Sequence, residues 1–370
     1  MTGGNRCAIV GGGLVGFVAY ATLLHGGIEP EEITVFGTEL DPAAAWRRRA
    51  ASIRQREMRS ESDGHCLPTS WPGLAVRDAL HRRTPAPLVQ SVCNRYHPSV
   101  GSFLEHVEEL RQRTAWDSRL GVARIEQVRS VEGGGFGLDG QGVFQHVLLA
   151  PGHPGPAMPD ELAEDPRAVH AYEPHEYADE VAVVGAGMAA ATEWLNALAA
   201  GARVISVRRR EPERRPLNVP RPLFSRRGLA RFQATDPLQR IALLRRFGAP
   251  SYPPGRAWDE PIADAAGAGR FRVAPEVDGE PQVICATGFK RGFAHNPLLA
   301  RLVTEHGVQT QGQWIVLAPD CTVPALTDET RTLALAGVPA QWAYPAADTL
   351  VGAKYAGRAF LRRVRACPTR

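Results

Sequence analysis

Two glycine patterns in the chain have the spacing that binds the pyrophosphate of a dinucleotide. The stretch CAIVGGGLVG, residues 7–16, places Gly11, Gly13 and Gly16 in a GxGxxG pattern between an apolar strand and an apolar helix. The first glycine allows a tight turn, the second lets a pyrophosphate approach the backbone, and the third lets helix and strand pack closely. We therefore expect a dinucleotide at this turn rather than a purely structural glycine bend.

The second pattern is GxGxxA, with Gly185, Gly187 and Ala190 in the stretch VAVVGAGMAAA. Alanine at the third position keeps the helix slightly farther from the strand, a variant found where NADP binds. The next strand ends in Arg208 and Arg209, where enzymes that bind NAD carry an acid for the ribose. Guanidinium groups match a 2′-phosphate in charge and geometry, so this pattern predicts an NADPH site. The alternative is a solvated basic loop.

The acid expected to hold the ribose of the first dinucleotide is displaced. The strand after the first turn ends in ITVFGTEL, which puts Gly37 where an acid usually stands and Glu39 two residues later. Glu39 is the candidate for the ribose contact. The alternative is an exposed glutamate, with the ribose held by backbone groups.

The elements around these turns predict two α/β units. Each turn starts a strand, helix and strand sequence, and each unit ends in a strand with a glycine turn, HVLLAPG in one and VICATG in the other. The fold class is therefore α/β, with two Rossmann-like doubly wound domains, one inserted into the other. We expect residues 1–160 and 283–370 to form the outer domain and residues 175–282 the inserted one.

An insertion rich in arginine and proline follows the second unit. The apolar spacing of residues 238–247 predicts a helix that packs on the inserted domain or lines a cleft. Residues 249–258 contain several turn formers and are expected to be a loop. A closing helix is expected at about residues 349–364.

Composition excludes several classes of protein. The 370 residues carry 43 basic and 39 acidic side chains, and the arginine cluster lacks interleaved aromatic residues, so we expect no nucleic-acid binding. The six cysteines form no CxxC pair, which excludes a zinc ribbon and a dithiol centre and favours a reducing, cytoplasmic setting. The histidines lack metal-ligand spacing, so no metal site is expected. The apolar run 14–24 is too short to span a bilayer, so no membrane partner is expected.

Three motifs together resemble those of flavoproteins with two dinucleotide-binding domains. They are GGGLVG near the N-terminus, GAGMAA with its downstream arginines, and CATGF at residues 285–289. Within these flavoproteins the chain is most similar to the flavin-containing monooxygenase-like group, which includes N-hydroxylating and Baeyer–Villiger enzymes. The resemblance implies that the first site binds FAD, that the inserted domain binds NADPH, and that the ATG turn leads back into the FAD domain.

The resemblance also implies roles for single residues. Trp46 and Arg47 match a Gly-Gly-x-Trp-Arg stretch that lies close to FAD, although alanines replace its glycines. Thr287 and Gly288 would lie at the domain junction. The last helix would direct its N-terminal amides at the flavin, which places Asp348 and Thr349 there. The FxGxxxHxxxW fingerprint of Baeyer–Villiger enzymes is incomplete, because only His170 and a nearby Tyr172 remain.

One polar loop in the FAD half is the place where a protein side chain is most expected to face flavin or substrate. It spans residues 55–73, and long polar loops in such domains are more often functional than decorative. Arg59 and His65 are its catalytic candidates, although the flavin itself would carry the chemistry. His65 and Cys66 are adjacent in the chain, so a nucleophilic dyad is not expected.

The resemblance implies an enzyme that consumes NADPH and oxygen. NADPH would reduce FAD, and a flavin hydroperoxide would pass one oxygen atom to an amine, sulfur or carbonyl of a small molecule. An NADPH-dependent flavin reductase of the thioredoxin-reductase type, acting on a quinone or disulfide without a CxxC centre, is the first alternative. A non-catalytic dinucleotide-binding flavoprotein is the second. The sequence fixes no oligomeric state, and a homodimer is compatible with it.

Overall fold

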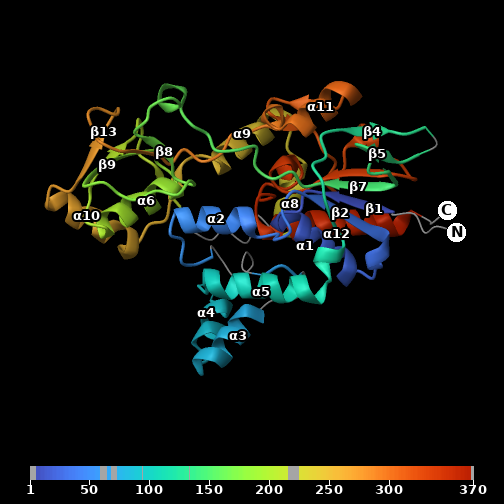
Figure 1. Ribbon diagram of the computed structural model, residues 1–370, viewed down its shortest axis with the longest axis horizontal. Helices are drawn as coiled ribbons and strands as arrows, with labels where there is room; N and C mark the ends of the chain where they lie inside the picture. The colour runs from blue at the N-terminus through green and yellow to red at the C-terminus, as the bar shows by residue number, and fades with distance from the viewer. Residues whose placement is uncertain are drawn as a thin grey trace.

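The computed structural model describes residues 6–58, 65–67, 73–93, 95–132, 134–215 and 225–367. They form two α/β domains that lie side by side (Figure 1). The first domain is built on a five-stranded sheet with strand order β17-β7-β1-β2-β3, and the second on a five-stranded sheet with order β13-β10-β9-β14-β8. Because β17 follows all strands of the second sheet in the chain, the second domain is inserted into the first, as predicted.

The first sheet is parallel throughout, and its inner strands are buried. Its strands are β1 (Cys7–Val10), β2 (Ile33–Gly37), β3 (Leu120–Val122), β7 (His146–Leu149) and β17 (Thr332–Leu335). Strand β1 lies between β2 and β7, and Cys7 is in register with Ile33 and His146. The strands β1, β7 and β17 are buried at every position, as expected for a parallel sheet covered on both faces.

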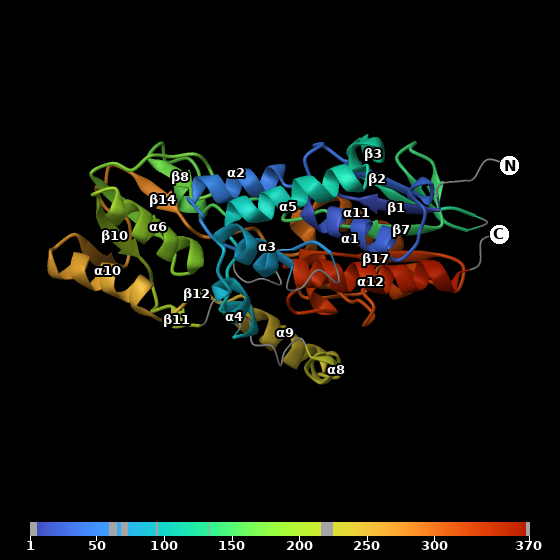
Figure 2. The ribbon, with the colours of Figure 1, turned by 90° about the horizontal axis from the view of Figure 1, so that it is seen from below.

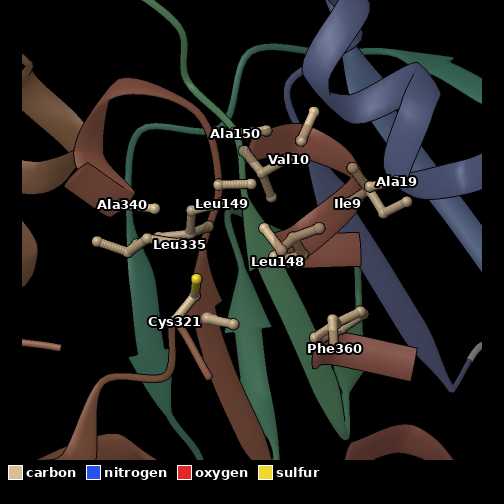
Figure 3. Packing of buried hydrophobic residues seen from close by; sticks show 14 of the residues in the cluster. Ile9, Val10, Ala19, Leu148, Leu149, Ala150, Cys321, Leu335, Ala340 and Phe360 are labelled. Atoms are coloured by element: carbon tan, nitrogen blue, oxygen red, sulfur yellow. The ribbon is translucent and has the colours of Figure 1, made fainter. Parts of the chain in front are cut away.

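Helices α1 (Leu14–His25) and α12 (Leu350–Ala366) pack against each other beside this sheet. Their backbones come close at Gly357, where a Cβ would lie 3.2 Å from the Cα of Ala19. Figure 3 shows Phe360 of α12 and Ala19 of α1 in one apolar cluster with the side chains of β1, β7 and β17. This core fixes the position of the first glycine turn.

The remaining elements of the first domain surround this sheet. The helices are α2 (Ala44–Ser52), α3 (Gly73–Arg82), α4 (Ala86–Val92), α5 (Val100–Arg113) and α11 (Pro297–His306). The short strands are β4 (Val128–Ser130), β5 (Phe136–Leu138), β6 (Val143–Phe144), β15 (Thr310–Gln311) and β16 (Trp314–Ile315). The 3₁₀ helix η7 spans Val338–Trp342. Helix α2 extends from the first domain toward the second in both ribbon views (Figures 1 and 2).

The second sheet is also parallel. Its strands are β8 (Ala168–His170), β9 (Glu180–Val184), β10 (Arg203–Val207), β13 (Phe271–Ala274) and β14 (Val283–Cys285). Strand β14 pairs with both β9 and β8, so the sheet includes two strands outside the expected range of 175–282. Helices α6 (Met188–Ala199) and α10 (Arg256–Gly267) pack together, and the buried Trp194 of α6 lies at the centre of this core.

The insertion behaves differently from its prediction in two respects. Helix α9 (Pro237–Phe247) forms as expected, and α8 (Arg226–Gln233) precedes it. However, Phe232 and Leu244 join the apolar core of the first domain, so the expectation that this helix packs on the inserted domain was wrong, and its alternative, that the helix lines a cleft, stays a prediction. The expected loop at 249–258 instead contains β12 (Ser251–Tyr252), which pairs with β11 (Glu213–Arg214), and the start of α10.

No helix within the described part of the chain is long and apolar enough to cross a membrane.

Candidate functional site

Backbone atoms close the first glycine turn at Gly11 and Gly16, whereas the turn is open at Gly13. Gly11 has φ +123°, and a Cβ there would lie 2.1 Å from the carbonyl oxygen of Ala150. A Cβ on Gly16 would lie 1.9 Å from the carbonyl oxygen of Gly11. A Cβ on Gly13, in contrast, would meet no atom of the described part of the chain within 4 Å. The turn therefore leaves open space at its second glycine, where a pyrophosphate is expected to approach.

Helix α1 begins at this open position without a competing group. Gly13 is its N-cap, no side chain among the described residues caps the helix, and its first turn carries no acidic residue. The first amides of a helix have no intrahelical acceptor and carry the positive end of the helix dipole. The start of α1 is thus suited to an anion such as a phosphate.

The second turn repeats this geometry with more space at its third position. Gly185 has φ +133°, and a Cβ there would lie 2.6 Å from the carbonyl oxygen of Ala286 and 3.5 Å from the Cβ of Ala190. An alanine therefore fits at the third position, in agreement with the greater helix distance inferred from the pattern. Gly187 is the N-cap of α6, which also lacks a capping side chain and a first-turn acid. A Cβ on Gly187 would meet nothing closer than Pro250 at 3.8 Å.

The two segments that cross between the domains run against each other. The amide of Ala157 donates to the carbonyl of Gly288 at 3.0 Å, and the amide of Lys290 donates to the carbonyl of Gly155 at 2.9 Å. The hydroxyl of Thr287 donates to the carbonyl of Ala157. Thr287 and Gly288 thus lie where the two crossing segments meet, at the junction of the domains.

His170 fastens β8 to this crossing. Its Nδ1 accepts from the amide of Tyr172 at 3.2 Å, so its proton is on Nε2, which donates to the carbonyl of Gly288 at 3.0 Å. Burial lowers the pKa of His170. These bonds hold a neutral imidazole in one orientation and leave it no free ring nitrogen for proton transfer.

Gly37 stands at the end of β2 because no side chain fits there. A Cβ on Gly37 would lie 2.7 Å from the Cα of Gly12. The carbonyl of Glu39 lies next to the same turn, 3.7 Å from the position of a Cβ on Gly12. The carboxylate of Glu39 forms an ion pair with Arg48 at 2.7 Å. The structure therefore places Glu39 beside the first turn, with its carboxylate directed to helix α2.

The two α2 residues singled out from the sequence make local contacts. The ring of Trp46 packs edge-on against Phe103 of α5, with centroids 5.0 Å apart. Arg47 is exposed and pairs with Asp41 at 3.0 Å. Trp46 fixes α2 against the first domain.

The two arginines after β10 differ in what they can reach. The side chain of Arg208 is only 11% exposed, pairs with Glu211 at 2.9 Å and lies over the ring of Trp194, 5.4 Å from its centroid. The side chain of Arg209 is 87% exposed and has a loose ion pair with Glu161 at 3.8 Å. Arg209 is therefore accessible to a ligand, whereas Arg208 is held against the second core.

The last helix begins as the sequence indicated. Thr349 is the N-cap of α12, and its hydroxyl accepts from the amide of Gly352 at 3.2 Å. The first turn of α12 carries no acidic residue, and Asp348, just before the cap, is exposed.

Of the two catalytic candidates, Arg59 lies outside the described residues. His65 is buried, and the amino group of Lys354 on α12 donates to its carbonyl at 3.2 Å. Its Nδ1 lies 3.0 Å from the carbonyl of Leu67, to which it donates. Burial and the nearby Lys354 lower the pKa of His65 to about 3, so the imidazole stays neutral. Lys354 was not singled out from the sequence, although a lysine inside a mostly apolar helix face was the available signal.

A buried polar cluster on α6 was also missed. The carboxylate of Glu193 is fully buried, 3.0 Å from Nε2 of His175, and accepts from the hydroxyl of Tyr177 at 2.7 Å. Arg54, which follows α2, lies over the ring of Tyr177 at 4.4 Å. The signal was an acidic residue inside an apolar helix directly after the second glycine turn.

No protein-family model matches the chain, and no curated protein matches it by sequence. Solved structures share its fold. An ornithine N-hydroxylase from Kutzneria sp. 744, solved with reduced FAD, NADP⁺ and L-ornithine, is similar at TM-score 0.74 and 14% identity, covering 98% of this chain and 99% of that chain. The ornithine hydroxylase of Pseudomonas aeruginosa is similar at TM-score 0.70 and 15% identity, covering 97% of this chain and 99% of that chain. The bacillithiol disulfide reductase of Bacillus cereus reaches 0.56 at 18% identity, covering 97% and 98%.

Proposed function

We propose that the chain is an FAD-dependent monooxygenase that consumes NADPH and transfers one oxygen atom from O₂ to a nitrogen, sulfur or carbonyl group of a small molecule. The observation that carries this proposal is the presence of two complete dinucleotide turns in two joined domains. The overall likeness to the two ornithine hydroxylases, over nearly the whole of both chains, supports it.

The first domain fits FAD. The open space at Gly13 and the uncapped start of α1 would hold its pyrophosphate, with Gly11 and Gly16 shaping the turn. Glu39 lies beside this turn and would reach the ribose after exchanging its partner Arg48. Trp46, Arg47, Asp348 and Thr349 stay proposed neighbours of the cofactor. When bound, FAD would supply electron transfer and activation of oxygen.

The second domain fits NADPH. Gly185, Gly187 and Ala190 form its turn, and the uncapped start of α6 would hold the pyrophosphate. Of the two arginines after β10, the exposed Arg209 would meet the 2′-phosphate, while Arg208 supports the strand end from the side of Trp194. Thr287 and Gly288 hold the crossing segments in a fixed orientation between the two sites.

Side chains of the chain itself would exclude water and keep protons in place. The amino group of Lys354 donates to the carbonyl of His65 and so links this residue to α12. The imidazole of His65 stays neutral in its buried position. The neutral imidazole would add no charge of its own to a flavin site beside it, whereas Lys354 brings a positive one. Neither group is required to act as a general base.

The reductase alternative receives weaker support. The bacillithiol disulfide reductase is similar at TM-score 0.56, against 0.74 for the Kutzneria hydroxylase. The cysteines within the described residues are all free, and five of the six are buried, which leaves no exposed dithiol for disulfide exchange. Burial raises the pKa of Cys66 to about 12, so this thiol stays protonated. We propose a cytoplasmic location on the same grounds, which cell fractionation tests.

The deciding experiment follows the fate of electrons from NADPH. Purified protein loaded with FAD is mixed with NADPH without oxygen, and bleaching of the flavin is recorded; oxygen is then admitted with candidate amines, thioethers and ketones. A monooxygenase consumes one NADPH and one O₂ for each oxygenated product. Quantitative release of hydrogen peroxide with every compound, together with rapid reduction of a quinone, would identify a reductase, and an unbleached flavin would leave only the non-catalytic reading.

The same assay with NADH tests Arg209, because Arg209→Ala should raise KM for NADPH far more than for NADH.

A further inference from the structure

Three arginines in or just after helix α2 form ion pairs with carboxylates. Arg47 pairs with Asp41, Arg48 pairs with Glu39, and Arg54, just beyond the helix, pairs with Glu176. Arg49 lies between them and is half-buried. Within the described residues, its guanidinium forms no ion pair and no hydrogen bond, and its central carbon lies over the ring of Phe289, 4.8 Å from the ring centroid.

The ring that Arg49 contacts belongs to the junction between the domains. Phe289 stacks on His153, with centroids 4.0 Å apart and planes inclined by 23°. It also stacks on Tyr172, with centroids 4.7 Å apart and planes inclined by 9°. Arg49 therefore reaches from a helix of the first domain to an aromatic stack made by segments that cross between the domains.

Two of the three rings in this stack belong to segments that lead directly from the glycine turns. His153 follows Ala150 by three residues, and the carbonyl of Ala150 closes the first turn at Gly11. Phe289 follows Ala286 by the same interval, and the carbonyl of Ala286 closes the second turn at Gly185. The guanidinium of Arg49 is thus next to the segments that join both dinucleotide sites.

Two guanidinium groups, those of Arg49 and Arg291, act on His153 at this junction. Burial has the largest influence on the pKa of Arg49 and lowers it. Tyr172 raises this pKa and Arg48 lowers it, and neither group is a carboxylate. Arg291 adds a second guanidinium near His153, and within the described residues its hydrogen bond goes to a carbonyl, that of Gly248, at 2.9 Å. Burial, Arg49 and Arg291 lower the pKa of His153 to about 4, so it stays neutral. A partly buried charge without a counter-ion is unfavourable until an anion binds.

We propose that Arg49 is an anion-binding residue of the domain junction, which receives an oxyanion of the ligand held between the two glycine turns. The proposal rests on the function proposed above. The oxyanion has two sources there, a phosphate of the nicotinamide dinucleotide or a carboxylate of the substrate. Both accept paired hydrogen bonds from one guanidinium, which makes arginine the suitable side chain.

The test measures binding in the FAD-loaded protein. Arg49→Met keeps an unbranched apolar chain against Phe289 and removes the charge, whereas Arg49→Lys keeps the charge and loses the paired geometry. Dissociation constants are measured by calorimetry for NADP⁺ and for L-lysine and cadaverine, which differ by one carboxylate. Arg301→Gln removes an exposed guanidinium on α11 and serves as the control. Flavin content and thermal unfolding of each variant show whether the domains stay assembled.

Two outcomes support the proposal and separate its sources. A loss of NADP⁺ affinity of about tenfold or more in Arg49→Met, partly restored in Arg49→Lys, assigns the oxyanion to the dinucleotide. A similar loss for L-lysine but not for cadaverine assigns it to a substrate carboxylate. Unchanged binding of NADP⁺ with no selective loss for L-lysine would overturn the proposal. A wild-type protein whose flavin is not bleached by NADPH would instead contradict the proposed function, independently of Arg49.

Discussion

At the scale of single residues, the three glycines of the first turn do different work. Gly16 is required by the protein itself, since a Cβ there would overlap the carbonyl of Gly11. Gly13 has an extended backbone, with φ −77° and ψ −176°, that any residue adopts, and a Cβ there would meet no protein atom within 4 Å. Within the described residues the fold gives no reason for glycine at this position, and we expect the reason to be a ligand.

This difference predicts opposite behaviour of two alanine variants. Gly16→Ala should destabilise the protein without any cofactor, by about 1–3 kcal/mol, because helix α1 must shift away from β1. Gly13→Ala should unfold like wild type in the deflavinated protein but should hold much less FAD. Thermal unfolding of the apoprotein and the ratio of flavin to protein after reconstitution measure the two effects. Full flavin content in Gly13→Ala would mean that the pyrophosphate does not lie at this turn.

The steric roles of Gly11 and Gly16 could be predicted from sequence because the spacing fixes which glycine meets the neighbouring backbone. That Gly13 faces a ligand stays a prediction. The charge pairing of α2 could not be predicted. The run WRRRA contains three adjacent arginines, and nothing in their order shows that Arg49 faces the second domain while Arg47 and Arg48 pair locally. Such a distinction depends on the direction of α2 relative to a domain that begins much later in the chain.

At the scale of elements, helix α6 forms a buried ion pair with the segment between β8 and β9, through Glu193 and His175. Burial alone would lower the pKa of His175, but the hydrogen bond and charge of Glu193 outweigh it, and the pKa is raised above 6.5 in the folded protein. Arg54 acts in the opposite direction from the side of α2. A raised pKa in the folded state means that the stabilisation is complete below about pH 6.5 and is lost as the pH rises through the folded value.

Glu193→Gln should therefore lower stability in a pH-dependent way. At pH 6 we expect a loss of about 1–3 kcal/mol, because a charged hydrogen bond in a buried site is removed. The difference in unfolding free energy from wild type should narrow toward pH 9, as His175 of the wild type loses its proton. Denaturant unfolding, followed by circular dichroism at the two pH values, measures the free energy of unfolding of both proteins. Glu164→Gln, an exposed change, is the control, and a gap that stays constant with pH would show that His175 is not charged in the folded state.

Helix periodicity could be read from the sequence, but the partner of a helix could not. The spacing of Leu244 and its apolar neighbours correctly predicted α9, whereas its packing on the first domain depends on the path of the insertion through space. The strand β12 was missed for a related reason. The two residues of β12 form a strand because they pair with β11, not because their own types favour one. Turn formers flank them on both sides.

At the scale of the whole molecule, the two domains repeat the same arrangement of a parallel sheet and a glycine turn. Each parallel sheet places a glycine turn at the carboxyl end of a central strand, β1 in one and β9 in the other, and each turn is closed by a carbonyl from the neighbouring strand. This arrangement could be predicted, because each turn came with its own strand, helix and closing strand in sequence order. The junction could be predicted only in part. The CATGF motif indicated Thr287 and Gly288 there, but the stacking of His153 and Tyr172 on Phe289 joins segments that share no motif.

The repeated design predicts that the two sites can be disabled separately. Gly187 is extended, with φ −94° and ψ −167°, and a Cβ there would only make ordinary contact with Pro250 and Ser251. Gly187→Ala should therefore fold, retain its FAD and resist reduction by NADPH, while dithionite still bleaches the flavin. Gly267→Ala at the end of α10, where a Cβ would meet nothing within 4 Å, should be reduced by NADPH like wild type. Stopped-flow absorbance under anaerobic conditions measures both rates. Normal reduction of Gly187→Ala would mean that NADPH binds elsewhere, and loss of FAD from it would mean that the two sites are not independent.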